Sequence, residues 1–210
     1  MVPAGTLAAF AAVALGMAVT PGPNMMYLAS RSISQGRAAG LVSLGGVAVG
    51  FVIYLVLTAF GITALAMAVP LAYDALRLAG AAYLAWLAWQ ALKPGARSPF
   101  EVRDLAPDSR PRLFVMGLLT NLLNPKAAAL YLSLLPQFVE PGRGSVLAQS
   151  LQLGAVQIAV SMLVNTTVIC TAGALAAFLA TRPTWARLQR RLMGAVLGGL
   201  AVRMALDTRR

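Results

Sequence analysis

Residues 38–73 read AAGLVSLGGVAVGFVIYLVLTAFGITALAMAVPLAY and contain no Asp, Glu, Lys or Arg. A helix needs about 20 mainly apolar residues to cross the roughly 30 Å hydrocarbon core of a membrane, and this stretch is long enough. Inside lipid the backbone must satisfy its own hydrogen bonds, so an apolar run of this length folds as a helix. We therefore expect a membrane-spanning helix over about Ala39–Thr63.

The composition of the whole chain is typical of a membrane protein. Of 210 residues, 59% are hydrophobic and 11% are charged, against roughly 45–50% and about 25% in an average soluble domain. Intrinsic disorder is excluded because it needs low hydrophobicity. A soluble globular fold is disfavoured because so short a chain has too little polar surface to cover this much apolar bulk.

Further apolar runs on both sides of this stretch extend the pattern, and we expect an all-α polytopic membrane protein with six transmembrane helices. The expected spans are about Ala4–Ser30, Ala39–Thr63, Leu71–Leu92, Leu113–Val139, Ser145–Leu179 and Trp185–Met204. Any one run alone could be a buried helix of a soluble core. Six runs in succession favour the membrane interpretation.

The basic residues are concentrated in three of the connections between these spans. The chain has 17 Lys and Arg against 6 Asp and Glu, a formal charge of +11. Most of the basic residues follow spans one, three and five, and cytoplasmic loops carry the excess of Lys and Arg. We therefore expect these loops in the cytoplasm and both termini on the opposite side. Topology and contact with anionic lipid explain the charge, so we expect no nucleic-acid partner.

The longest polar stretch, KPGARSPFEVRDLAPDSRPR, occupies residues 93–112 and contains four prolines. We interpret it as a cytoplasmic linker between a three-helix repeat at 1–92 and a second three-helix repeat at 113–210. Because three is an odd number, the two halves must enter the membrane from opposite sides. Two inverted repeats are the layout of many secondary transporters.

The residues that most enzymes and metal sites need are missing. The chain has no His, and Cys170 is its only cysteine. All six acidic residues fall in or near the connections, so no expected span has a carboxylate at its centre. We therefore expect no catalytic residue, no metal site and no cofactor. A Ser–Lys dyad that uses Lys126 is formally available, but nothing in the sequence places a serine beside it.

The first expected span is interrupted by Thr20-Pro21-Gly22-Pro23-Asn24. A proline inside a helix removes a backbone donor and costs roughly 3 kcal/mol or more. Unwound backbone at membrane depth persists only where protein or a water-filled cavity surrounds it. The freed carbonyls and amides, with Thr20 and Asn24, can then coordinate a polar solute. The alternative is a simple kink, packed by a neighbouring helix, in which Thr20 and Asn24 repair the backbone.

The fourth expected span is interrupted by Asn121-Leu122-Leu123-Asn124-Pro125-Lys126. A lysine at the centre of a membrane helix costs roughly 2.5–3.5 kcal/mol on insertion scales, so Lys126 is expected to face the protein interior. No membrane carboxylate is available to neutralise it, and a substrate carboxylate could do so. The alternative is a helix shifted toward the interface, with Lys126 reaching the head groups.

Both breaks lie in the first helix of their half, which is the pattern that points to a binding site at the membrane midplane between repeats. The fifth span is unusually polar, so we expect one of its faces to line a cavity, although each polar residue alone could instead hydrogen-bond to a neighbouring helix. Its polar residues include Gln152, Gln157 and Asn165. Glycines in the second span predict close contacts between helices. These glycines are Gly45, Gly46 and Gly50.

Three segments resemble the LysE/RhtB family of amino-acid exporters. AVTPGPNMMYLASRSISQGRAAGL (residues 18–41) is similar to the opening signature of the family, LRLAGAAYLAWLAWQALK (76–93) to its third helix and GLLTNLLNPKAA (117–128) to its fourth. The order of the motifs and the chain length match over nearly the whole sequence. The resemblance implies a carrier of the bacterial inner membrane that exports amino acids or relatives such as homoserine lactone, driven by proton exchange, in a homodimer.

The resemblance also implies which residues bind the substrate. They are Thr20, Pro21, Gly22, Pro23, Asn24, Asn121, Asn124, Pro125 and Lys126. Phe51 follows Gly50 at a position where some members of the family have an acidic or other polar residue. Because no membrane carboxylate is available to balance a cationic side chain, we expect neutral amino acids as substrates. A non-transporting membrane scaffold or lipid-binding protein, or a channel for small neutral solutes, is the alternative.

Overall fold

The computed structural model describes residues 1–68 and 107–181, together with residues 78, 81–82, 85–86, 89, 92–93, 191, 195, 198–199, 201–202 and 205–206. Within this part of the chain the regular structure is helical, without a strand. Most of the spans expected at Leu71–Leu92 and Trp185–Met204, and most of the 93–112 linker, lie outside the described residues.

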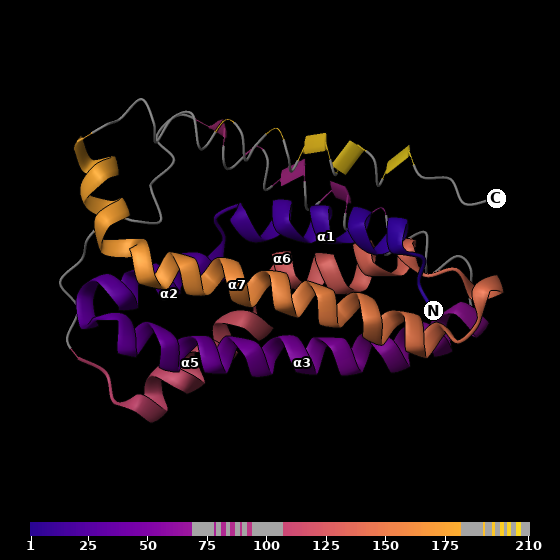
Figure 1. Cartoon of the computed structure of the whole chain (residues 1–210), viewed down its shortest axis with the longest axis horizontal. Helices are drawn as coiled ribbons and strands as arrows, with labels where there is room; N and C mark the ends of the chain where they lie inside the picture. Colours follow the sequence, from indigo (N-terminus) through magenta and orange to yellow (C-terminus); the bar gives the residue numbers. More distant parts are fainter. Residues whose placement is uncertain are drawn as a thin grey trace.

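Two long helices, α3 (Arg37–Ala68) and α7 (Val146–Thr181), form the frame of the molecule. They contact each other and run along its long axis (Figure 1). Within them, Arg37–Gly61 and Val146–Ala174 are long and apolar enough to cross a membrane, with mean hydropathies of 2.3 and 1.8. These ranges agree with the spans expected at Ala39–Thr63 and Ser145–Leu179.

The first expected span is divided into two helices, α1 (Ala4–Val19) and α2 (Pro23–Gln35), whose axes differ by 53°. Thr20 and Gly22 have extended backbone between them. Pro23 is the first residue of α2, where a proline fits because the backbone N–H of that position has no partner within the helix. The predicted break at residues 20–24 is therefore confirmed.

The fourth expected span is also broken. Helix α5 (Arg110–Leu122) begins three residues before the expected boundary, and Pro125 starts the short helix α6 (Pro125–Ala129). A π-helical turn, η1 (Leu130–Leu134), and two 3₁₀ turns, η2 (Leu135–Phe138) and η3 (Pro141–Arg143), complete the segment. The bend between Arg110–Leu122 and Lys126–Phe138 is 50°, and the described part has up to four spans if each bent pair counts as one.

Glycines allow α3 and α5 to approach each other at backbone distance. A Cβ atom on Gly46 would lie 1.9 Å from the carbonyl oxygen of Phe114, and one on Gly117 would lie 2.1 Å from that of Ser43. Neither helix could hold this position with a side chain at these places. The predicted close contact at the glycines of the second span is confirmed for Gly46 and for Gly50, which lies against the side chain of Asn121.

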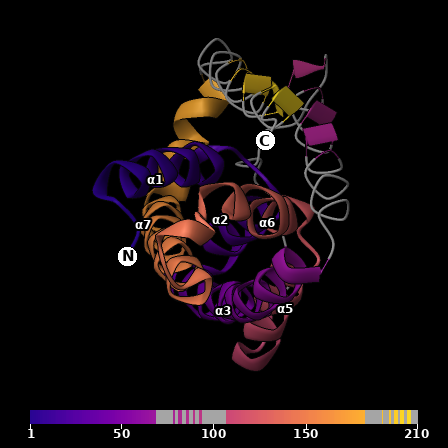
Figure 2. The same cartoon turned by 90° about the vertical axis from the view of Figure 1, so that its right-hand side faces the viewer.

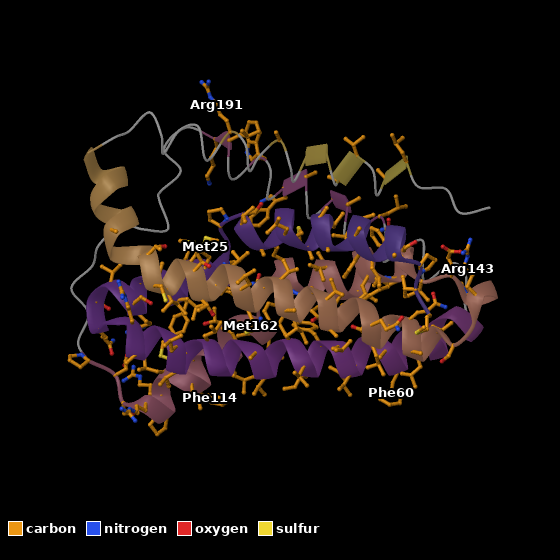
Figure 3. All side chains as sticks on the ribbon, viewed as in Figure 1. Met25, Phe60, Phe114, Arg143, Met162 and Arg191 are labelled. Carbon is orange, nitrogen blue, oxygen red and sulfur yellow. The ribbon has the colours of Figure 1, made fainter. Side chains whose placement is uncertain are left out.

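Apolar side chains on the outside of the bundle suit a lipid environment. Phe60 points away from the neighbouring helices (Figure 3), and 64% of its surface is exposed. In water such apolar surface would be costly. Charged pairs lie instead at the two ends of the molecule, with Arg143 at one end and the start of α5 at the other (Figures 1 and 3). An end-on view places α2 and α6 in the middle, surrounded by α1, α3 and α7 (Figure 2).

Candidate functional site

The two breaks meet at the ammonium group of Lys126. Its Nζ donates hydrogen bonds to the carbonyl oxygen of Met17 at 2.8 Å and to that of Thr20 at 2.5 Å. Both carbonyls belong to the end of α1, where a helix has no further N–H groups to satisfy them. The positive charge also lies at the negative end of the α1 dipole, which is its favourable end for a cation. Lys126 therefore joins the second break to the first.

Gly22 leaves room for this lysine. A Cβ atom on Gly22 would lie 3.0 Å from both Cε and Nζ of Lys126. The backbone of Gly22 is extended, with φ −158°, so the conformation itself does not require glycine. The small size of Gly22 is therefore what allows Lys126 to reach the carbonyls of α1.

Asn124 positions Lys126 through the backbone. The Asn124 Oδ1 atom accepts a hydrogen bond from the backbone N–H of Lys126 at 3.0 Å, which makes Asn124 the N-cap of α6. A capping side chain satisfies one of the N–H groups that a helix leaves unpaired at its start. Because α6 begins at this cap, Asn124 decides where the helix starts and in which direction the Lys126 side chain leaves it.

The carbonyls freed at the second break have partners within the protein. The hydroxyl of Tyr54 donates to the carbonyl oxygen of Leu122 at 2.8 Å, and the backbone N–H of Asn124 donates to that of Asn121 at 3.0 Å. Tyr54 also stacks on Tyr131, with ring centroids 5.5 Å apart. The second break is thus repaired by α3 and by its own turn, whereas the carbonyls of the first break face the ammonium of Lys126.

A small cavity of about 30 Å³ lies beside this contact, between α1, α2, α3, α6 and α7. Its polar lining residues are Asn24, Asn124, Lys126, Gln157, Ser161 and Asn165. The volume suits one water molecule, whereas sites for small ligands usually measure roughly 300–1,000 Å³. Among the described residues that line the cavity, Lys126 carries the only charge. The cavity is therefore too small for an amino acid in this conformation and must widen before one can bind.

Helix α7 supplies a polar stripe on the opposite wall. The Gln157 Nε2 atom donates to Ser161 Oγ at 2.7 Å, and Asn165 Nδ2 donates to the carbonyl oxygen of Ser161 at 2.8 Å. Residues four apart share a helix face, so these three residues line the cavity together. The hydroxyl of Tyr131 donates to Gln157 Oε1 and connects the stripe to the second broken segment.

The prediction that one face of this helix lines the cavity is confirmed by Gln157 and Asn165, whereas Gln152 fits the alternative of a hydrogen bond to another segment. The Gln152 Oε1 atom accepts from the backbone N–H of Val2 at 2.9 Å, outside the cavity lining. Sequence reasoning missed Ser161 and Tyr131. Ser161 lies four residues from both Gln157 and Asn165, so helical spacing would have found it. Nothing in the sequence pointed to Tyr131.

Two of the predicted site residues have buried polar atoms without a partner. Asn24 is 7% exposed and lines the cavity, and its Oδ1 atom accepts no hydrogen bond. Asn121 is fully buried, and both its Oδ1 and its Nδ2 atoms lack a partner. An unmet buried polar group costs about 1–3 kcal/mol. Asn24 offers this acceptor at the cavity, whereas Asn121 lies in the contact with Gly50.

The nine predicted site residues thus divide into three groups. Thr20, Gly22 and Lys126 are in contact, and Asn24 and Asn124 line the same cavity as Lys126. The prolines shape the backbone: Pro21 is half-buried in the break, while Pro23 and Pro125 begin α2 and α6. Asn121 is the exception, because it packs between α5 and α3 and does not belong to the cavity lining.

A second polar cluster, absent from the sequence predictions, joins α2 to the start of α5. The Asp108 carboxylate accepts hydrogen bonds from Arg31, from Arg112 Nε at 3.0 Å and from Gln35 Nε2 at 3.3 Å. The backbone N–H of Asp108 donates to Gln35 Oε1 at 2.9 Å. The Asp108 side chain is only 8% exposed. This cluster ties the two broken helix pairs together at one end of the molecule.

The chain matches the family model described as LysE type translocator over residues 15–208. A homoserine/homoserine lactone efflux protein of Salmonella typhimurium is 35% identical over 164 residues, which cover 78% of each chain. A leucine efflux protein of an Enterobacter species is 25% identical over 187 residues, 89% of each chain.

An uncharacterized membrane protein of Pseudomonas aeruginosa is 30% identical over 195 residues, which cover 90% of this chain and 89% of the relative. No solved structure matches the chain. The comparisons thus rest on sequence, and the match to the family model includes both breaks.

Proposed function

The chain belongs to the LysE type translocator family, and from this premise we propose that it exports neutral amino acids or close derivatives of them. The family consists of membrane transporters and not of enzymes. Two of the relatives are named for the efflux of homoserine and its lactone and of leucine. Homoserine and leucine have uncharged side chains, which agrees with a neutral substrate.

The observation that carries the proposal is the meeting of both helix breaks at Lys126. The carbonyl end of α1 and the amide end of α2 face the same break, so a negative and a positive helix end lie close together. An amino acid is a zwitterion and matches this polarity. We assign its carboxylate to the first amides of α2 and to Lys126, and its ammonium to the freed carbonyls of α1 and to Asn24. Asn124 takes part through its cap on α6.

The charge of the cavity supports a neutral substrate. Lys126 is the single charged group among the described lining residues. A lysine or arginine substrate would bring a second cation into this low-dielectric site without a carboxylate to balance it. The substrate carboxylate balances one positive charge, so a zwitterion without a charged side chain is accommodated best.

The proposed mechanism is alternating access in a six-helix fold of two inverted repeats, at 1–92 and 113–210, joined by the linker at 93–112. The corresponding breaks in α1/α2 and α5/α6, with bends of 53° and 50°, support this arrangement. The small volume of the cavity supports a cycle in which the site changes shape to admit the substrate. From the family resemblance we further propose a bacterial inner-membrane location, proton exchange as the energy source and a homodimer. From the excess of Lys and Arg in three connections we propose that the basic loops lie in the cytoplasm.

The test is a counterflow panel in proteoliposomes. Vesicles containing the purified protein are preloaded with one amino acid, and uptake of the same radiolabelled amino acid is measured for each member of the panel. We expect transient accumulation of neutral amino acids, including homoserine or leucine, and none of lysine or arginine. No counterflow with any amino acid would refute the exporter and favour a scaffold. Flux without saturation or trans-stimulation would indicate a channel.

A further inference from the structure

We propose that the ammonium of Lys126 and the ammonium of the transported substrate take turns in one subsite, formed by the carbonyl oxygens of Met17 and Thr20. Between transport events Lys126 fills the subsite, and during export the substrate fills it. The inference rests on the proposed function and deepens it, because it identifies the cation subsite and gives Lys126 a task in the empty carrier.

The geometry at the end of α1 fits any primary ammonium. The Lys126 Nζ atom lies 2.8 Å from the carbonyl oxygen of Met17, an ordinary distance for a charged N–H donor, and 2.5 Å from that of Thr20, a closer contact. The α-ammonium of an amino acid has the same charge and the same three donors as a lysine side chain. Whatever holds Lys126 at this position therefore also attracts the substrate.

The interactions that bind the Lys126 ammonium allow another cation to replace it. In the described part of the chain the carboxylates are Asp108, which pairs with Arg31 and Arg112, and Glu140, which pairs with Arg143. Neither lines the cavity. Lys126 is thus held by neutral carbonyl groups and not by a counter-ion. A cation held by backbone dipoles alone is displaced by a second cation more easily than one in an ion pair.

An unused acceptor beside the subsite favours the substrate over the lysine. The Oδ1 atom of Asn24 is buried, belongs to a residue of the cavity lining and accepts no hydrogen bond while Lys126 is in place. A substrate ammonium that enters from the cavity can use this atom as well as the two carbonyls. Satisfying a buried acceptor removes its desolvation penalty. The substrate therefore gains an interaction that Lys126 does not make.

The consequence concerns the return of the empty carrier. When the substrate ammonium displaces Lys126, the lysine is free to turn to the substrate carboxylate. After release, Lys126 returns to the α1 carbonyls, so the carrier reorients without leaving these buried acceptors unpaired. Exchange of one substrate molecule for another does not need this return, because a substrate ammonium fills the subsite in both directions. Net efflux into substrate-free medium does need it.

The experiment compares these two modes in one preparation. Proteoliposomes are loaded with L-leucine or L-homoserine, whichever the wild type exchanges faster, and release is measured with and without the same amino acid outside. The variant Lys126→Met keeps an unbranched side chain, one heavy atom shorter, and removes its charge. Lys93→Met is the matched control, because Lys93 is the only other lysine and is exposed.

We expect Lys126→Met to lower the ratio of net efflux to exchange at least about tenfold, the factor that follows from losing even one of the two hydrogen bonds of the ammonium. Methylammonium in the buffer should partly restore net efflux, because a free primary ammonium can fill the subsite. The Lys126 ammonium, tethered to the protein, acts at an effective concentration in the mM range or above, so methylammonium is needed at about that concentration. Lys93→Met should have the wild-type ratio and no response to methylammonium.

The proposal is overturned if Lys126→Met lowers exchange and net efflux equally, or if the ratio is unchanged. If this variant aggregates in size-exclusion chromatography, Gly22→Ala replaces it. Its new methyl group would lie 3.0 Å from Nζ and from Cε, so the lysine side chain has to shift by a few tenths of an ångström while its charge is kept. A smaller fall in the ratio, in the same direction, is therefore expected. If the wild type transports no amino acid at all, the proposed function itself has failed.

Discussion

Replacing Asn124 by Ala and by Ser separates two roles that this residue could have in transport. The sequence predicts that Asn124 binds the substrate, whereas in the structure its Oδ1 atom caps α6 and accepts from the N–H of Lys126 at 3.0 Å. Serine is about as good an N-cap as asparagine, and alanine cannot cap at all. A residue that works through the cap should therefore tolerate serine and not alanine.

The magnitude follows from the local structure. Loss of an N-cap costs about 0.5–2 kcal/mol. Helix α6 has only five residues before the π-helical turn η1 begins, so few other hydrogen bonds hold its first turn in place. We therefore expect the upper half of this range, about 1–2 kcal/mol. Since each 1.4 kcal/mol is a factor of ten, the fraction of carriers with Lys126 correctly oriented should fall about 5- to 30-fold.

The assay is initial-rate counterflow as a function of substrate concentration, normalised to the amount of protein that elutes as a single peak in size-exclusion chromatography. Asn124→Ala should raise the half-saturating concentration about 5- to 30-fold, and Asn124→Ser should stay within about threefold of the wild type. If both variants are equally impaired, the amide binds the substrate directly and the capping argument is wrong. If neither is impaired, the orientation of Lys126 does not matter for transport.

Three further predictions concern the packing around the site, and each is checked by thermal unfolding in detergent or by counterflow. Gly46→Ala should destabilise the protein by about 1–3 kcal/mol, because the new methyl group would lie 1.9 Å from the Phe114 carbonyl oxygen. Gly61→Ala, in the same helix, meets nothing within 4 Å and should be neutral or slightly stabilising. Equal melting temperatures of the two variants would contradict the α3–α5 contact. Asp108→Asn should lower the free energy of unfolding by about 1–3 kcal/mol, because its carboxylate is nearly buried and pairs with Arg31 and Arg112. Glu140→Gln should lower it by about 0–1 kcal/mol, because the side chains of Glu140 and its partner Arg143 are 43% and 61% exposed. The reverse order would show that the Asp108 cluster does not tie α2 to α5. Gln157→Leu should raise the half-saturating substrate concentration about 5- to 30-fold, because it leaves the Tyr131 hydroxyl and Ser161 without their partner. An unchanged value would show that the polar stripe of α7 does not take part in substrate binding.

The sequence predicted those features of the protein that depend only on residues close together in the chain: long helices, helix breaks and the burial of a charged side chain. The uncharged runs marked α3 and α7, because a helix in lipid depends on the length and polarity of its own segment. The prolines at 21 and 23 and at 125 marked both breaks, because a proline disrupts the turn that precedes it whatever the rest of the chain does. Lys126 was expected to face the interior on the cost of burying its charge, and it does.

The sequence did not predict which residues from distant segments are in contact. Nothing near Lys126 in the sequence indicates that its partners are the carbonyls of Met17 and Thr20, or that Arg31, placed by the sequence in a connection, pairs with Asp108. Gln152 and Gln157 have the same chemistry in the same helix, yet only Gln157 lines the cavity. Helical periodicity gives the angle about the helix axis that separates two side chains, but not which neighbouring segment each side chain contacts. Which distant side chains meet was decided by the packing of the helices, and between α3 and α5 this packing depends on Gly46 and Gly117, which let the two backbones touch.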